Sequence, residues 1–187
     1  MIRTFIALEI NAETRDAIMD DVAELKHDFR RIKWVGPESL HVTLKFLGDV
    51  GEKDLNDIFS AVDEVAARHG PFVVDVETVG VFPNWRAPRV VWAGCGEGKD
   101  EIVSLQKNIE SNLAELGYEP EKRHFNPHIT LGRIKLPADG CGLFDAARGM
   151  LDTNYGFMDV DAVTVFMSEM KRSGPVYTPM HHARLSS

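Results

Sequence analysis

Two copies of one four-residue signature place the strongest constraint on how this chain folds. The first copy, HVTL, spans residues 41–44, and the second, HITL, spans residues 128–131. Because successive side chains of a β-strand point to opposite faces, each copy predicts a strand with His and Thr on one face and two aliphatic residues on the other. An accidental repeat of this pattern is very improbable. The sequence therefore predicts two related strands that can bring two imidazoles and two hydroxyls to one anionic group.

The periodicity of the remaining sequence predicts alternating helices and strands. Helical spacing of apolar residues predicts helices over 12–29, 52–68, 101–116 and 143–150. Alternating or β-rich runs predict strands over 1–10, 32–35, 41–47, 72–81, 89–93, 128–134, 160–166 and 176–181. Each signature strand follows a strand–helix unit, so the halves look like a diverged duplication about a pseudo-twofold axis. The expected fold class is α+β, with helices outside antiparallel-rich sheets around a central groove.

Length and charge limit the kinds of partner that we expect. A chain of 187 residues suits one compact domain and is long enough for two lobes. Acidic residues outnumber basic ones, 29 to 21, for a formal net charge of −8. Proteins that follow long nucleic acids carry a basic stripe that replaces counterions. An RNA ligand would therefore be held at an end or at a single phosphodiester, without extended duplex binding.

The sequence also carries expectations about compartment. It contains neither an apolar run long enough to span a membrane nor a signal peptide pattern. The two cysteines, Cys95 and Cys141, have neither metal-ligand nor redox spacing. We therefore expect a cytoplasmic protein with free thiols and no membrane partner. The sequence does not address the oligomeric state.

The sequence around the signatures resembles the 2H phosphoesterase superfamily, and within it the LigT-like RNA 2′,3′-cyclic phosphodiesterases once called 2′-5′ RNA ligases. The resemblance runs through RTFIA at 3–7, HVTLKFLG at 41–48, GVFP at 80–83, NPHITLGR at 126–133 and GPVY at 174–177. It implies that residues 1–187 form a single bilobal catalytic domain with one signature strand in each lobe. It also implies hydrolysis, without metal or cofactor, of a 2′,3′-cyclic phosphate to a 2′-phosphomonoester. It implies RNA 3′ ends or small cyclic-phosphate nucleotides as partners, and a weak reverse reaction that joins RNA ends through a 2′-5′ bond.

The resemblance also implies roles for the signature residues. His41 would be the proton donor to the leaving 3′-oxygen, and His128 the proton acceptor that activates water. The residue types agree with this chemistry, because imidazole, with a pKa near 6.5, can act as acid or base at neutral pH. The hydroxyls of Thr43 and Thr130 can donate to the non-bridging oxygens as negative charge builds there. The sequence by itself does not decide which histidine is the acid.

Each of the other residues near the signatures has two interpretations, one functional and one structural. Arg133 matches an arginine that follows the second signature in this family, and a guanidinium suits phosphate, but a regular strand would point it away from His128. Phosphate contact and a structural ion pair both stay open. Lys45 shares the face of His41 on a regular strand but lies further along it, so we expect it on a solvated face. Four aromatic residues can either stack a base or fill the core: Trp34, Phe82, Trp85 and Tyr177.

Three alternative functions stay open at this point. A metallohydrolase could use both histidines as ligands, but a zinc site needs a third or fourth ligand, and none has suitable spacing. A non-catalytic RNA-end binder could keep the groove without turnover, although binding alone does not need two titratable groups. A related 2H phosphodiesterase could carry the same four residues and act on a cyclic nucleotide, an ADP-ribose cyclic phosphate, a 2′-5′ oligonucleotide or U-tailed RNA.

Overall fold

The computed structural model describes residues 1–172 and 174–186. Its strands are β1 (Ile2–Glu9), β2 (Lys33–Trp34), β3 (His41–Val50), β4 (Phe72–Phe82), β5 (Val90–Cys95), β6 (His128–Arg133), β7 (Asn154–Val160), β8 (Ala162–Lys171) and β9 (Gly174–Arg184). Across these described residues they join in one sheet of order β7-β4-β5-β6-β3-β1-β8-β9, with β2 added to β6. Every pairing that the sheet contains is antiparallel.

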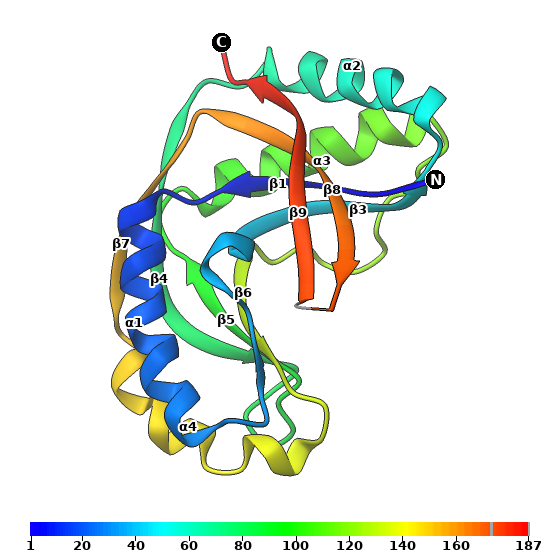
Figure 1. Cartoon of the computed structure of the whole chain (residues 1–187). Coiled ribbons are helices and arrows are strands. Elements are labelled where there is room, and N and C mark those ends of the chain that lie inside the picture. The colour runs from blue at the N-terminus through cyan, green and yellow to red at the C-terminus, as the bar shows by residue number, and fades with distance from the viewer. Residues whose placement is uncertain (173, 187) are drawn as a thin grey trace.

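The sheet and the helices that pack beside it form two lobes. They are α1 (Ala12–Asp28), α2 (Leu55–Ala66), α3 (Lys99–Glu115) and the short α4 (Leu143–Ala146). Helices α2 and α3 lie over the lobe formed by β3, β1, β8 and β9, whereas α1 and α4 lie beside the lobe formed by β6, β5, β4 and β7 (Figure 1). The signature strands β3 and β6 are neighbours where the lobes meet. The predicted α+β class is confirmed.

Local chemistry explains where the long helices begin and end. Helix α1 begins after Asn11, whose side-chain oxygen accepts from the Thr14 backbone N–H at 2.9 Å. This N-cap satisfies one of the donors that the first turn leaves free. Helix α1 packs on β7 through its buried face. Helix α3 is followed by Gly117 at a φ of +89°, a left-handed conformation that favours glycine and ends a helix.

The periodicity missed one strand. We predicted no element over 154–159, yet β7 pairs with β4 along this segment. The pairing skips Tyr155, and Gly156 follows it at a φ of +102°. This irregularity breaks the two-residue alternation by which a strand is recognised in sequence.

Each signature strand carries a β-bulge at the last residue of its signature. On β3, the partners of Ile6 and Ala7 in β1 are Lys45 and Thr43, so Leu44 has no partner there. A bulge shifts the alternation of side chains by one residue. Lys45 therefore turns to the face of the buried Ile6, and the next residue, Phe46, turns to the face of Thr43.

The bulge on β6 occupies the equivalent place. Val91 and Trp92 of β5 pair with Gly132 and Thr130, so Leu131 has no partner there. Gly132 is consequently on the buried face, and the next residue, Arg133, is on the same face as Thr130. The two halves therefore repeat both the signature and the irregularity that follows it.

Candidate active site

The two signatures lie side by side in the middle of the sheet. Val42 pairs with Ile129, and both side chains are fully buried on the helix-covered face. The antiparallel register places each signature histidine next to the threonine of the other copy, on the opposite face of the sheet. The histidines therefore occupy one diagonal of a four-residue arrangement and the threonines the other: His41 beside Thr130, and Thr43 beside His128.

Backbone carbonyls orient both imidazoles. The Nδ1 of His41 lies 2.8 Å from the Ser39 carbonyl oxygen, and the Nδ1 of His128 lies 2.7 Å from the Asn126 carbonyl oxygen. Because a carbonyl only accepts, each Nδ1 carries the donating proton, and each neutral ring keeps an unprotonated Nε2. The Nε2 of His41 is 2.9 Å from the Thr43 hydroxyl, which donates to it.

Aromatic side chains cover the imidazoles. The His41 ring lies 5.0 Å from the Phe5 ring and 5.3 Å from the Tyr177 ring, measured between centroids. The His128 ring meets the Phe82 ring edge-on at 5.0 Å. These contacts restrict the rotation of both catalytic candidates and remove water from around them.

Burial and a neighbouring charge favour the neutral form of both histidines. Desolvation is the largest cause that lowers the pKa of His41 to about 4, and the Arg133 and His128 charges add to it. Desolvation also lowers the pKa of His128, again assisted by Arg133. The carbonyl hydrogen bonds act in the opposite direction on both rings. Both imidazoles are therefore neutral at pH 7 when the site holds no ligand.

A cavity of about 270 Å³ opens over this arrangement. His41, Thr43 and Thr130 line it, together with Arg133. His128 is on the same face of the sheet but is not among the residues that line the cavity. The predicted signature residues are thus brought together, with the two threonines and His41 at the cavity wall.

The predicted direction of the Arg133 side chain was wrong. A regular strand would have turned this side chain away from His128, but the bulge at Leu131 restores it to the same face. The positive charge of Arg133 lowers the pKa of both signature histidines. Among the residues that the structure describes, Arg133 has no ion-pair partner, so the structural ion pair is not observed there.

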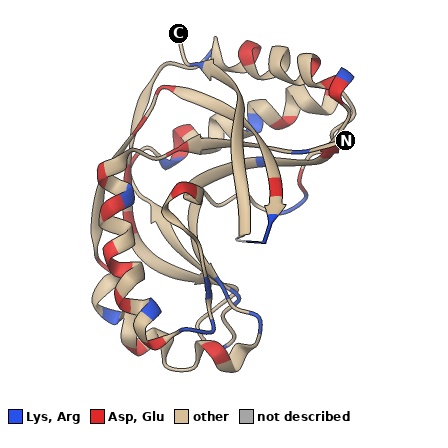
Figure 2. Ribbon diagram, viewed as in Figure 1, with Lys and Arg blue, Asp and Glu red and all other residues tan. Residues whose placement is uncertain are grey.

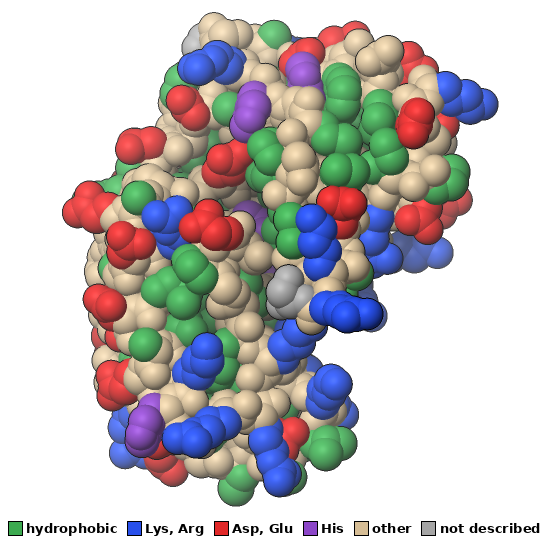
Figure 3. Space-filling model, in the orientation of Figure 1, with side chains coloured by type: hydrophobic (Ala, Val, Ile, Leu, Met, Phe, Trp, Pro, Cys, Tyr) green, Lys and Arg blue, Asp and Glu red, His purple; other side chains and the backbone are tan. Residues whose placement is uncertain are grey.

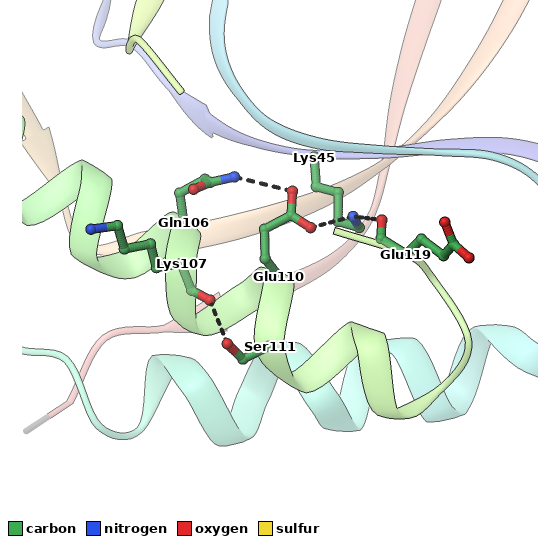
Figure 4. A network of polar contacts seen from close by, with 6 residues as sticks. All are labelled: Lys45, Gln106, Lys107, Glu110, Ser111 and Glu119. Atoms are coloured by element: carbon green, nitrogen blue, oxygen red, sulfur yellow. Dashed lines mark hydrogen bonds and ion pairs between the residues drawn. The ribbon is translucent and has the colours of Figure 1, made fainter. Parts of the chain in front are cut away.

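The expectation that Lys45 lies on a solvated face was also wrong. The bulge at Leu44 turns it into the interior, where it is 3% exposed. Its ammonium group pairs with Glu110 of α3 and donates to the Glu119 carbonyl oxygen at 2.9 Å (Figure 4). The second Glu110 oxygen accepts from the Gln106 amide at 3.1 Å. One lysine thus ties the first signature strand to α3 and to the loop that leads to the second signature.

The four aromatic candidates divide between the cavity and other sites. Trp34 and Tyr177 line the cavity, and Phe82 packs against His128 without lining it. Trp85 packs edge-on against Phe144 and is not part of the cavity wall. The sequence analysis did not single out Phe46, which lines the cavity although its side chain is 58% exposed. The bulge that brings it there has no signal in a single sequence.

Charge is distributed unevenly despite the negative total. In Figure 3, Lys and Arg side chains gather around the notch between the lobes on the right, and Asp and Glu lie mostly along the left edge and the top. Figure 2 shows the same separation along the ribbon. Lys33 and Arg133 line the cavity that holds the signature residues, and Arg3 lines the cavity next to it. The concave side is therefore locally basic.

Within residues 1–172 and 174–186, the structure has no group of three or more His, Cys, Asp or Glu side chains that could hold a metal ion. Cys95 is buried and Cys141 exposed, and both are free thiols, as predicted. The described part of the chain also lacks a helix with the length and apolar character needed to cross a bilayer.

Comparisons with known proteins find a matching family, similar sequences and similar folds. The model of a family described as LigT like Phosphoesterase matches residues 8–92 and 94–177, and each segment contains one signature. An RNA 2′,3′-cyclic phosphodiesterase from Methanothermobacter thermautotrophicus is 36% identical over 98% of this chain and 99% of its own. The crystal structure of a protein from Thermus thermophilus has a TM-score of 0.82 and 30% identity, with 98% of each chain covered. The structure of E. coli LigT complexed with 3′-AMP has a TM-score of 0.73 and 26% identity, covering 100% of this chain and 99% of that one.

Proposed function

Because this chain belongs to the LigT-like phosphoesterase family, we propose that it hydrolyses the 2′,3′-cyclic phosphate at RNA 3′ ends to a 2′-phosphomonoester. The observation that carries the proposal is the diagonal placement of the two histidines across the paired signature strands. An in-line displacement at phosphorus needs a base on one side and an acid on the other. Two imidazoles on a diagonal flank an atom held at the centre of the arrangement from opposite sides.

In the proposed reaction, His128 takes a proton from water as the water oxygen attacks phosphorus. The bond between phosphorus and the 3′-oxygen breaks, and His41 gives its proton to that oxygen. The Thr43 and Thr130 hydroxyls, with the Arg133 guanidinium, stabilise the negative charge on the non-bridging oxygens. With a 5′-hydroxyl in place of water as the nucleophile, the same displacement would break the bond between phosphorus and the 3′-oxygen and form a 2′-5′ linkage.

The lowered pKa of His41 determines when it becomes an acid. A value of about 4 leaves His41 neutral in the free enzyme at pH 7. A bound phosphodiester brings a negative charge that favours the imidazolium form. The proton for the leaving group is therefore taken up as substrate binds. The pH dependence of kcat/KM reports the protonation state of the free enzyme, so kcat/KM should rise as the pH falls from 7 toward 5. The pH dependence of kcat reports the enzyme–substrate complex, so kcat should stay high up to a higher pH.

The direct test is incubation with 2′,3′-cyclic nucleotides and with RNA that ends in a cyclic phosphate, with and without a chelator. We expect a 2′-phosphate product, the same rate in chelator, and a loss of about 10²–10⁴-fold in kcat for His41→Ala and for His128→Ala. The double variant should lose less than the product of the two factors, because the groups act as a unit. Loss of activity in chelator that zinc restores would favour the metallohydrolase. Tight RNA binding without turnover would favour the non-catalytic binder.

A further inference from the structure

The catalytic cavity continues into a second cavity over the first lobe. The second cavity has a volume of about 450 Å³, within the range of pockets that hold small ligands. The two cavities share five wall residues, so they form one groove: Lys33, Phe46, Arg133, Pro175 and Tyr177. The far end of the groove runs past Arg3 of β1 and Met170 of β8. The hydrolysis of a cyclic phosphate uses only the end that holds the signatures.

Three cations line this groove without partners in the described part of the chain. Arg3, Lys33 and Arg133 form neither an ion pair nor a side-chain hydrogen bond with any other residue that the structure describes. The charges of Arg3 and Arg133 both act on Tyr177, which lies between the two cavities. Such cations converging on one groove are an unusual feature in a chain with a net charge of −8. They favour an anionic ligand longer than one phosphate.

Exposed apolar surface accompanies these cations. Phe46 is 58% exposed and Met170 is 70% exposed, and both line the second cavity. Its floor includes the Phe5 ring, which stacks on Phe166 at 5.2 Å and meets Tyr177 edge-on at 4.9 Å. Proteins that bind single-stranded nucleic acid combine these two kinds of side chain. The bases pack on apolar and aromatic side chains, and the phosphates contact the cations.

We infer that the second cavity is a subsite for the nucleotide that precedes the cyclic end, and that Arg3 and Lys33 hold the phosphodiester linking the two nucleotides. The inference rests on the proposed function and adds a preference: the enzyme acts on the end of a single strand in preference to a cyclic mononucleotide. The Arg3 guanidinium would contact the linking phosphate from β1, and the exposed Phe46 ring would contact the base. A mononucleotide leaves Arg3, which lines the second cavity and not the first, without a ligand.

A comparison of kcat/KM for three substrates measures the contribution of the linking phosphate. They are a 2′,3′-cyclic mononucleotide, a dinucleotide with the same cyclic end, and that dinucleotide with a neutral methylphosphonate linkage. We expect kcat/KM for the dinucleotide to exceed that of the mononucleotide by roughly tenfold or more, as befits one charge-assisted contact and one stacked base. The methylphosphonate should lose the part of this gain that the charge-assisted contact provides and keep the part that the stacked base provides. The plot of log kcat/KM against log salt should be steeper by about 0.7 for the charged dinucleotide than for the neutral one.

Arg3→Gln removes one cation from the second cavity, and Lys26→Gln, on the exposed surface of α1 and outside both cavities, makes the same change of charge elsewhere. Arg3→Gln should reduce the preference for the charged dinucleotide by about tenfold and have little effect on the neutral one, whereas Lys26→Gln should keep the full preference. Equal kcat/KM for the three substrates, or equal effects of both variants, would overturn the subsite and leave the proposed function intact. Failure of the wild-type enzyme to hydrolyse all three would overturn both.

Discussion

The buried pair between Lys45 and Glu110 provides a quantitative test of how the first signature strand is held. The two residues are 3% and 6% exposed, so neither charge has bulk water to solvate it. Removal of one partner from such a pair leaves an uncompensated buried charge, which typically costs about 3–5 kcal/mol. Lys45→Met keeps most of the side-chain volume and isolates this electrostatic effect. We expect it to lower the free energy of unfolding by about 3–5 kcal/mol, a large part of the total for a domain of this size.

A double replacement separates the charge from the packing. Lys45→Met with Glu110→Leu removes both charges, and replacing a buried pair by apolar residues is often neutral or stabilising by about 1–4 kcal/mol. The Glu119 carbonyl and the Gln106 amide would then lose a partner, at about 1–3 kcal/mol each when buried. The two effects largely cancel, so the double variant should lie within about 2 kcal/mol of the wild type. The two changes are therefore strongly coupled.

Urea denaturation of the wild type, both single variants and the double variant gives the four free energies that this cycle needs. A loss below about 1 kcal/mol for Lys45→Met would show that the pair is solvated, contrary to its burial. A double variant that is less stable than either single variant would show that the pair is a net contributor to stability. Either result would refute the reasoning from desolvation.

Three further predictions concern the active-site face. Arg133→Gln removes a charge that lowers the pKa of both signature histidines; both limbs of the kcat/KM profile should move to higher pH while kcat/KM falls about 10- to 100-fold, and an unmoved profile would contradict this. Thr43→Val should fold normally but lose about a hundredfold or more in kcat/KM, whereas Thr43→Ser should stay within about tenfold; equal activities would show that the hydroxyl is not catalytic. In Gly80→Ala the new Cβ would lie 2.2 Å from the Trp92 ring, so the melting temperature should fall by several degrees, for an overpacking cost of about 1–3 kcal/mol; an unchanged melting temperature would contradict the close approach.

The signature residues could be predicted from the sequence because their chemistry and their alternation agree. Two-residue spacing places His41 with Thr43, and His128 with Thr130, on any regular strand. Antiparallel pairing of the two copies then needs only the pseudo-twofold symmetry that a repeat suggests. The core helices were predictable for a similar reason, since the buried residues of α1 and α3 recur at helical spacing.

The residues just beyond each signature could not be predicted, and one cause accounts for the errors there. The bulges at Leu44 and Leu131 reverse the alternation, so Lys45 enters the core and Arg133 enters the site. A bulge depends on how a strand fits its neighbours, which no local pattern in one sequence reports. The same limit applies to Phe46, whose place in the groove follows from the bulge before it.

The late position of β9 in the chain has a consequence for synthesis. This strand supplies Tyr177 and Pro175 to the groove, and it pairs with β8, which in turn pairs with β1 near the start of the sequence. The lobe that holds His41 therefore closes only after β9 has left the ribosome. A nascent chain that already displays both signatures would therefore have an unfinished groove until β9 has paired with β8.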